Sequence, residues 1–220
     1  MEELDIFFAA LQASEDPYIR RESLAHEAGE LIPEDRKSLT HLVLKEVHDF
    51  PAIANAIHRD KSINLIGLVR DPVAVLKSWI SAPGEWSPDW NIEEEWFYAN
   101  EKNCQYRGNH FGVKAWLETT EALLQLERER PSQVTLLKYR DLKEEPSVVV
   151  AAILGSLGLD LSPEVKDLIQ RGREASDSNP YSIFRGAVGD YAHSVIPDFI
   201  SKKTREITSR KGLGDFLDFA

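Results

Sequence analysis

The chain has 220 residues, of which 42% are hydrophobic and 29% charged, and its formal net charge at pH 7 is −11. This length and apolar content suffice for one globular domain with a sizeable core. The acidic balance excludes a general DNA- or RNA-binding protein, because neutralising a polyphosphate backbone requires a surplus of Lys and Arg. A small phosphorylated ligand needs only a local basic pocket.

The number of cysteines and the length of the apolar runs indicate the cellular compartment of the protein. The single cysteine, Cys104, cannot form an internal disulfide, and no Cys/His set has the spacing of zinc ligands. We therefore expect a reducing compartment and no bound metal. The first residues lack the basic stretch of a signal peptide, and the longest apolar run, residues 148–154, is too short to span a bilayer. The sequence predicts a cytoplasmic protein that binds no membrane.

The first elements form a strand-helix-strand pattern. Two short β-rich runs, residues 42–45 and 63–69, flank a segment in which Asp49 and Pro51 can begin a helix that continues to Arg59. Residues before this pattern are charged and helical in character.

The second half continues the alternation. Residues 92–130 have helical spacing with an interruption near 108–112, and a third β-rich run, 134–139, follows them. Residues 146–157 are again helical in pattern. Alternating strands and helices predict an α/β fold with a mostly parallel central sheet flanked by helices, and ligands bind such sheets at the carboxyl ends of the strands.

The last predicted elements are two helices separated by a loop. Ser162 and Pro163 supply an N-cap and a first-turn proline for a helix that ends near Gly172. Another helix is expected over residues 197–209, and residues 173–190 are interpreted as loop.

A motif that suits an anion follows the second β-rich run. Arg70 stands at the end of that run, Pro72 at the first turn of the next helix, and Ser78 two turns into the helix. A guanidinium fork and a hydroxyl placed in this way can close on one phosphate. The alternative is that Arg70 pairs with Asp71 or another carboxylate while Ser78 faces solvent.

This spacing resembles the sulfotransferase family that uses 3′-phosphoadenosine 5′-phosphosulfate (PAPS). The family binds the 3′-phosphate of its nucleotide with an Arg at a strand end and a Ser eight residues later, as Arg70 and Ser78 are spaced here. The resemblance implies a P-loop NTPase-like fold, PAPS as sulfuryl donor, the desulfated nucleotide PAP as product, and no metal.

A second match lies at the third β-rich run. Residues 137–142, Leu-Lys-Tyr-Arg-Asp-Leu, resemble the family's strand that ends in Tyr-Glu-Asp-Leu, with Arg140 where Glu is usual. The resemblance implies that Tyr139 flanks the adenine, for which its ring offers flat apolar area and its hydroxyl a polar contact. The alternative is that Tyr139 caps the core of the sheet.

A third match is a glycine-containing loop. The sequence from Phe184 to Tyr191, Phe-Arg-Gly-Ala-Val-Gly-Asp-Tyr, resembles the family's Arg-Lys-Gly-x-x-Gly-Asp-Trp loop, which implies that Arg185 and Gly186 contact the 3′-phosphate. Phe184 and Tyr191 replace the family's Arg and Trp. Residues 210–216 have a similar pattern with one residue fewer between the glycines, and we interpret them as the cap of the C-terminal helix.

Three catalytic candidates lie near the end of the first β-rich run. In small-molecule sulfotransferases a catalytic His shortly follows a Lys on this strand and precedes the phosphate-binding Arg by 22 residues, and His48 precedes Arg70 by 22. The family spacing is Lys-x-His, so either His48 or Lys45 aligns without a gap, but not both. His48 is the first choice of base, because a neutral imidazole accepts a proton near pH 7. Glu46 is its rival, since glycan-sulfating relatives use a Glu.

Four of the five tryptophans fall in one segment after the phosphate-binding helix: Trp79, Trp86, Trp90 and Trp96. Aromatic faces suit sugars and phenols, so the segment is a candidate lid over an acceptor. Trp79 and Trp96 are alternatively core anchors of their helices.

The family's N-terminal loop, Pro-x-Ser/Thr-Gly-Thr/Ser-Thr, holds the 5′-phosphosulfate, and no such stretch precedes Lys45. We therefore expect an N-terminally truncated fold of one domain, comprising a helical segment (1–41), a family-like core (42–191) and C-terminal helices (192–220). The strand that leads into this loop in the family is expected to be absent as well. Its absence leaves an open edge of the sheet, which residues 1–41, a second copy of the chain or a separate partner would cover.

The resulting prediction is a sulfotransferase that moves the sulfuryl group of PAPS to a hydroxyl of a small molecule or saccharide. One alternative is a non-catalytic relative that retains only 3′-phosphoadenosine nucleotide binding or a protein-interaction role. Another is a structural α/β module without a ligand.

Overall fold

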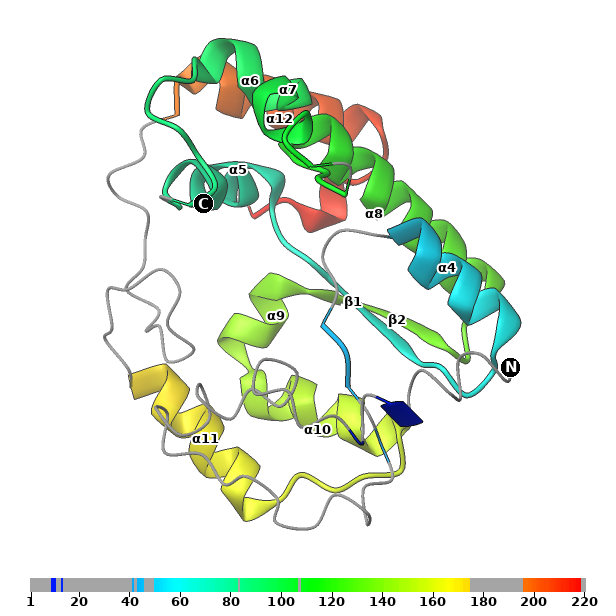
Figure 1. Cartoon of the computed structure of the whole chain (residues 1–220). Coiled ribbons are helices and arrows are strands. Elements are labelled where there is room, and N and C mark those ends of the chain that lie inside the picture. The colour runs from blue at the N-terminus through cyan, green and yellow to red at the C-terminus, as the bar shows by residue number, and fades with distance from the viewer. Residues whose placement is uncertain are drawn as a thin grey trace.

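The computed structural model of the chain describes residues 9, 10, 13, 41, 43–45, 50–82, 84–106, 108–174 and 196–218. Its helices and strands, in chain order and as labelled in Figure 1, are α4 (Phe50–Arg59), β1 (Leu65–Val69), α5 (Pro72–Ile80), α6 (Ile92–Tyr98), α7 (Asn100–Asn103), α8 (Gly112–Glu129), β2 (Val134–Lys138), α9 (Tyr139–Glu144), α10 (Pro146–Ser156), α11 (Pro163–Glu174), α12 (Asp198–Arg210) and the 3₁₀ turn η2 (Gly214–Phe216).

A parallel strand pair lies at the centre of the fold. β1 and β2 pair in parallel, with a register that runs from Leu65 opposite Val134 to Val69 opposite Lys138. Helices α5 to α8 connect the two strands, as a parallel crossover requires. This arrangement confirms the α/β class and the strands expected at 63–69 and 134–139, although Tyr139 begins α9 instead of ending the strand.

The strand expected at 42–45 is wrong for its described residues. Val43, Leu44 and Lys45 have no regular structure and are exposed, with Val43 at 88%. Apolar and β-branched residues favour a strand only where neighbouring strands and a packed face support them. Among the described residues the sheet contains only β1 and β2, so that support is missing.

The main core lies on one side of the strand pair, among α5, α6, α8 and α12 (Figure 1). Its buried residues include Leu76, Trp79, Trp96, Leu117 and Ile200. Burying such side chains contributes about 1.5–3 kcal/mol each. The interpretation of Trp79 and Trp96 as core anchors is therefore confirmed.

A chain of ring contacts ties the tryptophan segment to this core. Trp79 and Trp86 meet edge to face with centroids 4.9 Å apart, and Trp86 and Trp90 do so at 5.4 Å. The Trp79 indole N–H donates to the carbonyl of Glu85 at 3.1 Å. The segment after α5 is thus folded back onto the helix that precedes it.

Helices α9, α10 and α11 lie on the other side of the strand pair (Figure 1). Pro146 and Pro163 open α10 and α11, as expected, and the Ser162 hydroxyl accepts a hydrogen bond from the Val165 N–H at 3.3 Å. α11 continues two residues past Gly172, so the expected loop begins later than 173, and residues 175–190 lie outside the described part.

The C-terminal helix and its cap agree with the sequence. Helix α12 spans Asp198–Arg210, and Gly212 follows it with a φ of +73°, a left-handed conformation that glycine adopts without strain. The Leu213 N–H donates to the Thr208 carbonyl at 3.0 Å. The interpretation of 210–216 as a helix cap is confirmed. None of the described helices combines the length and apolar character of a bilayer span.

Candidate functional site

The site is organised around the turn between β1 and α5. Asp71 is the N-cap of α5: its Oδ1 accepts the Ala74 N–H at 2.8 Å, and Pro72 occupies the first turn. This cap satisfies one of the free N–H groups that every helix start leaves. Arg70 is thereby held at the carboxyl end of β1, where parallel sheets bind ligands.

Arg70 and Tyr139 lie side by side beyond the strand ends. Because Val69 pairs with Lys138, the next residue of each strand emerges at the same edge of the sheet. The Arg70 guanidinium carbon lies 4.9 Å from the centroid of the Tyr139 ring, a cation–π distance. Residue Tyr139 as a whole is 36% exposed, so it is not enclosed by the core.

A cavity of about 530 Å³ opens between α5 and α8 beside the end of β1, and both Arg70 and Ser78 line it. Its volume is in the range of small-molecule sites, about 300–1,000 Å³. The remaining wall is mostly apolar and includes the aromatic rings of Trp79, Phe111 and Trp116. The two residues of the predicted phosphate-binding pair therefore border one cavity.

Trp116 also belongs to this site, although the sequence motifs do not indicate it. Its indole N–H donates to the backbone carbonyl of Arg70 at 3.0 Å, which fixes the end of β1 against α8. Trp116 also meets the ring of Phe216 edge to face at 6.5 Å. A tryptophan on an amphipathic helix carries no sequence signal that distinguishes this bond from ordinary core packing.

Two further polar residues of the cavity wall, Glu85 and His110, were also missed. The Glu85 carboxylate accepts a hydrogen bond from the Lys102 Nζ at 2.6 Å. Lys102 is buried, with only 9% of its surface exposed. This ion pair joins the tryptophan segment to α7.

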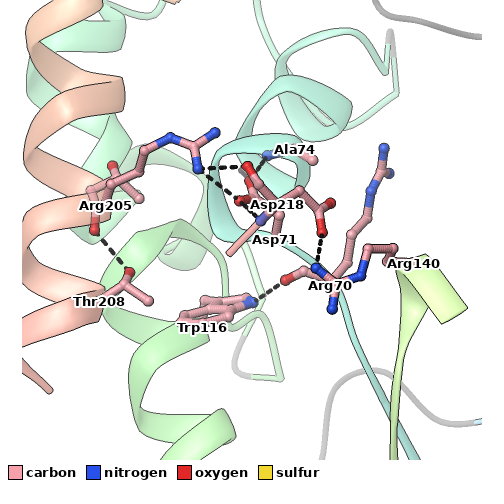
Figure 2. Close-up of polar contacts among 9 residues, drawn as sticks. Arg70, Asp71, Ala74, Trp116, Arg140, Arg205, Thr208 and Asp218 are labelled. Atoms are coloured by element: carbon pink, nitrogen blue, oxygen red, sulfur yellow. Dashed lines mark hydrogen bonds and ion pairs between the residues drawn. The ribbon is translucent and has the colours of Figure 1, made fainter. Parts of the chain in front are cut away.

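The C-terminal segment reaches the same turn (Figure 2). Asp71 Oδ2 accepts the Asp218 N–H at 3.0 Å and lies 3.4 Å from Nη1 of Arg205. Arg205 Nη1 also donates to the Asp218 carbonyl at 2.9 Å. Arg140 Nη1 lies 3.7 Å from the Asp218 carboxylate. Nothing in the sequence pattern indicated this network.

Of the other predicted site residues, none that the structure describes lines the cavity, and Tyr139 is connected to it only through its contact with Arg70. Lys45 is exposed, lies in a segment without regular structure and does not line the cavity. Glu46, His48, Arg185 and Gly186 lie outside the described residues, so their roles stay predictions. Within the described ranges, no group of three or more His, Cys, Asp or Glu side chains is placed to hold a metal ion.

The fold and cavity define an α/β protein with a candidate ligand site at the carboxyl end of a parallel strand pair. A sequence model of the sulfotransferase domain matches residues 21–177, which is more than half of the chain. The chain therefore belongs to the sulfotransferase family, as its motifs suggested, and has a sulfotransferase-type transferase function. No curated protein and no solved structure gave a significant match.

Proposed function

We propose that this protein transfers the sulfuryl group of PAPS to a hydroxyl group of a small molecule or saccharide. The observation that carries the proposal is that Arg70 and Ser78 line one cavity, in a chain of the sulfotransferase family. A guanidinium at a strand end and a hydroxyl on the following helix are groups that can bind a phosphate ester.

In this proposal Arg70 and Ser78 bind the 3′-phosphate of the nucleotide. The Asp71 cap and the Trp116 bond hold the Arg70 backbone from two sides, so its side chain starts from a fixed point. Tyr139, beside Arg70, flanks the adenine. Arg185 and Gly186 add a second cation and a close backbone contact, in the roles that the family motif assigns to them.

Bound PAPS supplies an activated sulfuryl group, and PAP leaves. His48 accepts the proton of the acceptor hydroxyl as its oxygen attacks sulfur, with Glu46 as the alternative base. If Lys45 instead of His48 takes the aligned position, its ammonium places positive charge where it builds on the leaving oxygen, as cations do in the related phosphoryl transfers. The aromatic wall of Trp79, Phe111 and Trp116 excludes water and suits an acceptor with a flat apolar face.

The exposed face of the strand pair indicates a binding partner. Ile66 and Leu68 of β1 are 40% and 47% exposed, although strands of a parallel sheet are normally covered on both faces. We propose that a second copy or another protein segment covers this strand pair.

The single cysteine and the acidic composition support a cytoplasmic site of action without nucleic-acid or membrane ligands.

Calorimetric titration with PAP tests the nucleotide site. Arg70→Ala should weaken PAP binding by about tenfold or more, because a charge-assisted hydrogen bond is lost. Ser78→Ala should weaken it less. Arg128→Ala removes an exposed arginine of α8 that does not line the cavity, and it should leave the affinity unchanged. Equal affinities for Arg70→Ala and Arg128→Ala would contradict the site.

Turnover is tested with radiolabelled PAPS and a panel of phenols, steroids and saccharides. Transfer of label to any hydroxyl acceptor, lost in His48→Ala, supports the reaction and the base. PAP binding without transfer to any acceptor would favour the non-catalytic relative. Absence of PAP binding would favour a scaffold without this ligand.

A further inference from the structure

Charges of both signs gather where the two strands end. The cations are the side chains of Arg70, Arg140 and Arg205, and the anions are those of Asp71, Asp141 and Asp218. In a chain with a formal charge of −11, an anionic ligand depends on such local cations. The carboxylates at this edge therefore decide how much positive charge a ligand meets.

Arg140 is loosely held at this edge. It immediately follows Tyr139, whose ring lies over the Arg70 guanidinium. Its Nη1 is 3.7 Å from Oδ1 of Asp218 and its Nε is 3.6 Å from Oδ1 of Asp141, while 38% of the Arg140 side chain is exposed. Ion pairs this long and this exposed contribute little to stability, so Arg140 can exchange them for a better anion.

Asp218, in contrast, is fixed through its backbone. Its N–H donates to the buried Asp71 carboxylate at 3.0 Å, and its carbonyl accepts from Arg205 at 2.9 Å. Its side chain is 46% exposed and points toward Arg140 (Figure 2). The carboxylate is therefore held near Arg140 and can turn away without disturbing the backbone contacts.

We propose that Arg140 is a further phosphate-binding residue of the nucleotide site and that Asp218 is its internal counter-ion, which competes with the ligand for it. The inference rests on the proposed function. It extends that function to Arg140, which stands where the Tyr-Glu-Asp-Leu motif of the family has a Glu and therefore carries the opposite charge. Binding of a phosphate beside Arg70 transfers Arg140 from the Asp218 carboxylate to the ligand.

PAP titration of the full chain at several salt concentrations tests this assignment. Arg140→Ala and Arg140→Gln should each weaken PAP binding by about tenfold, since one charge-assisted contact is removed. Asp218→Asn should strengthen it about threefold, because the competing carboxylate is neutralised while the backbone contacts remain. Lys143→Ala is the matched control: it removes one positive charge from an exposed position on the same helix, α9.

Salt separates a ligand contact from a structural role. A direct phosphate contact makes affinity fall with salt, so Arg140→Ala should show a shallower salt dependence than Lys143→Ala. Thermal unfolding of each variant checks that the fold is kept. Equal affinity and salt dependence in Arg140→Ala and Lys143→Ala, with Arg70→Ala still impaired, overturn this inference alone. Unchanged affinity in Arg70→Ala overturns the nucleotide site itself.

Discussion

The carboxylate of Asp71 accepts a hydrogen bond from the backbone N–H of Asp218, 147 residues later in the chain. The other oxygen of the same carboxylate caps α5 through the Ala74 N–H. One buried side chain thus connects the end of β1, the start of α5 and the C-terminal segment. The turn that carries Arg70 therefore depends on contacts with the C-terminal segment.

Replacing this carboxylate should destabilise the protein. Asp71→Asn removes the charge that Arg205 and the Asp218 N–H face, and its amide N–H₂ has to point either at these two donors or at the Ala74 N–H. We expect a loss of about 3 kcal/mol in the free energy of unfolding, as for other broken buried polar contacts. Urea unfolding followed by tryptophan fluorescence measures it. Asp160→Asn, an exposed control, should change stability by about 0.5 kcal/mol or less.

Gly112, the first residue of α8, should not tolerate a side chain. Its φ is +90°, and an added Cβ would lie 2.6 Å from the Phe97 carbonyl oxygen. Gly112→Ala should therefore cost about 2–4 kcal/mol of unfolding free energy. Gly155 lies in α10, and beyond the backbone of that helix its new Cβ would meet no atom within 4 Å, so Gly155→Ala should be neutral or more stable by up to about 1 kcal/mol. Similar losses in both variants would refute the steric argument.

The local part of the site could be predicted from the sequence. Alternating apolar patterns and the prolines at the starts of α5, α10 and α11 defined the helices and the strand pair. Parallel pairing then brings Arg70 and Tyr139 to the same edge, because both directly follow paired strand ends. The strand expected at 42–45 is wrong because a short, mostly apolar run does not determine whether a neighbouring strand is present.

The long-range polar contacts could not be predicted. Trp116 and Arg70 are 46 residues apart, and Arg205 and Asp71 are 134 apart. In the sequence, Arg205 is one of several charges on a helix whose outer face is normally solvated. Only the packing of α12 against α5 places it beside Asp71. Such contacts depend on tertiary geometry, which a residue pattern does not contain.

Gln133 should contribute more to stability than a typical glutamine. Its side-chain amide is buried and donates to the carbonyls of Asp60 at 2.8 Å and Ile63 at 3.0 Å, so it ties the turn before β1 to the start of β2. Gln133→Ala leaves these carbonyls without their donor and should cost about 2 kcal/mol of unfolding free energy. Gln125→Ala removes an exposed amide of α8 and should change stability by about 0.5 kcal/mol or less.

Asp60, in the turn before β1, should contribute to the free energy of unfolding at neutral pH, and this contribution should be lost in acid. Its carboxylate accepts from the Ser62 hydroxyl at 2.7 Å and from the Ser62 N–H at 2.8 Å, and these bonds lower the pKa of Asp60 below its usual value of 3.8, the hydroxyl most strongly. The charged form is favoured in the folded state, so this stabilisation is full above the unfolded-state pKa. It is lost as the pH falls through the lower folded-state pKa.

Ser62→Ala removes the main cause of this shift. The pKa of Asp60, followed by NMR of its carboxyl carbon, should rise toward its usual value in this variant and stay low in the exposed control Ser147→Ala. The wild-type protein should be more stable than Ser62→Ala at pH 7, and this difference should shrink as the pH is lowered below about 4. An Asp60 pKa that is the same in Ser62→Ala and wild type would show that the Ser62 hydroxyl does not stabilise the carboxylate.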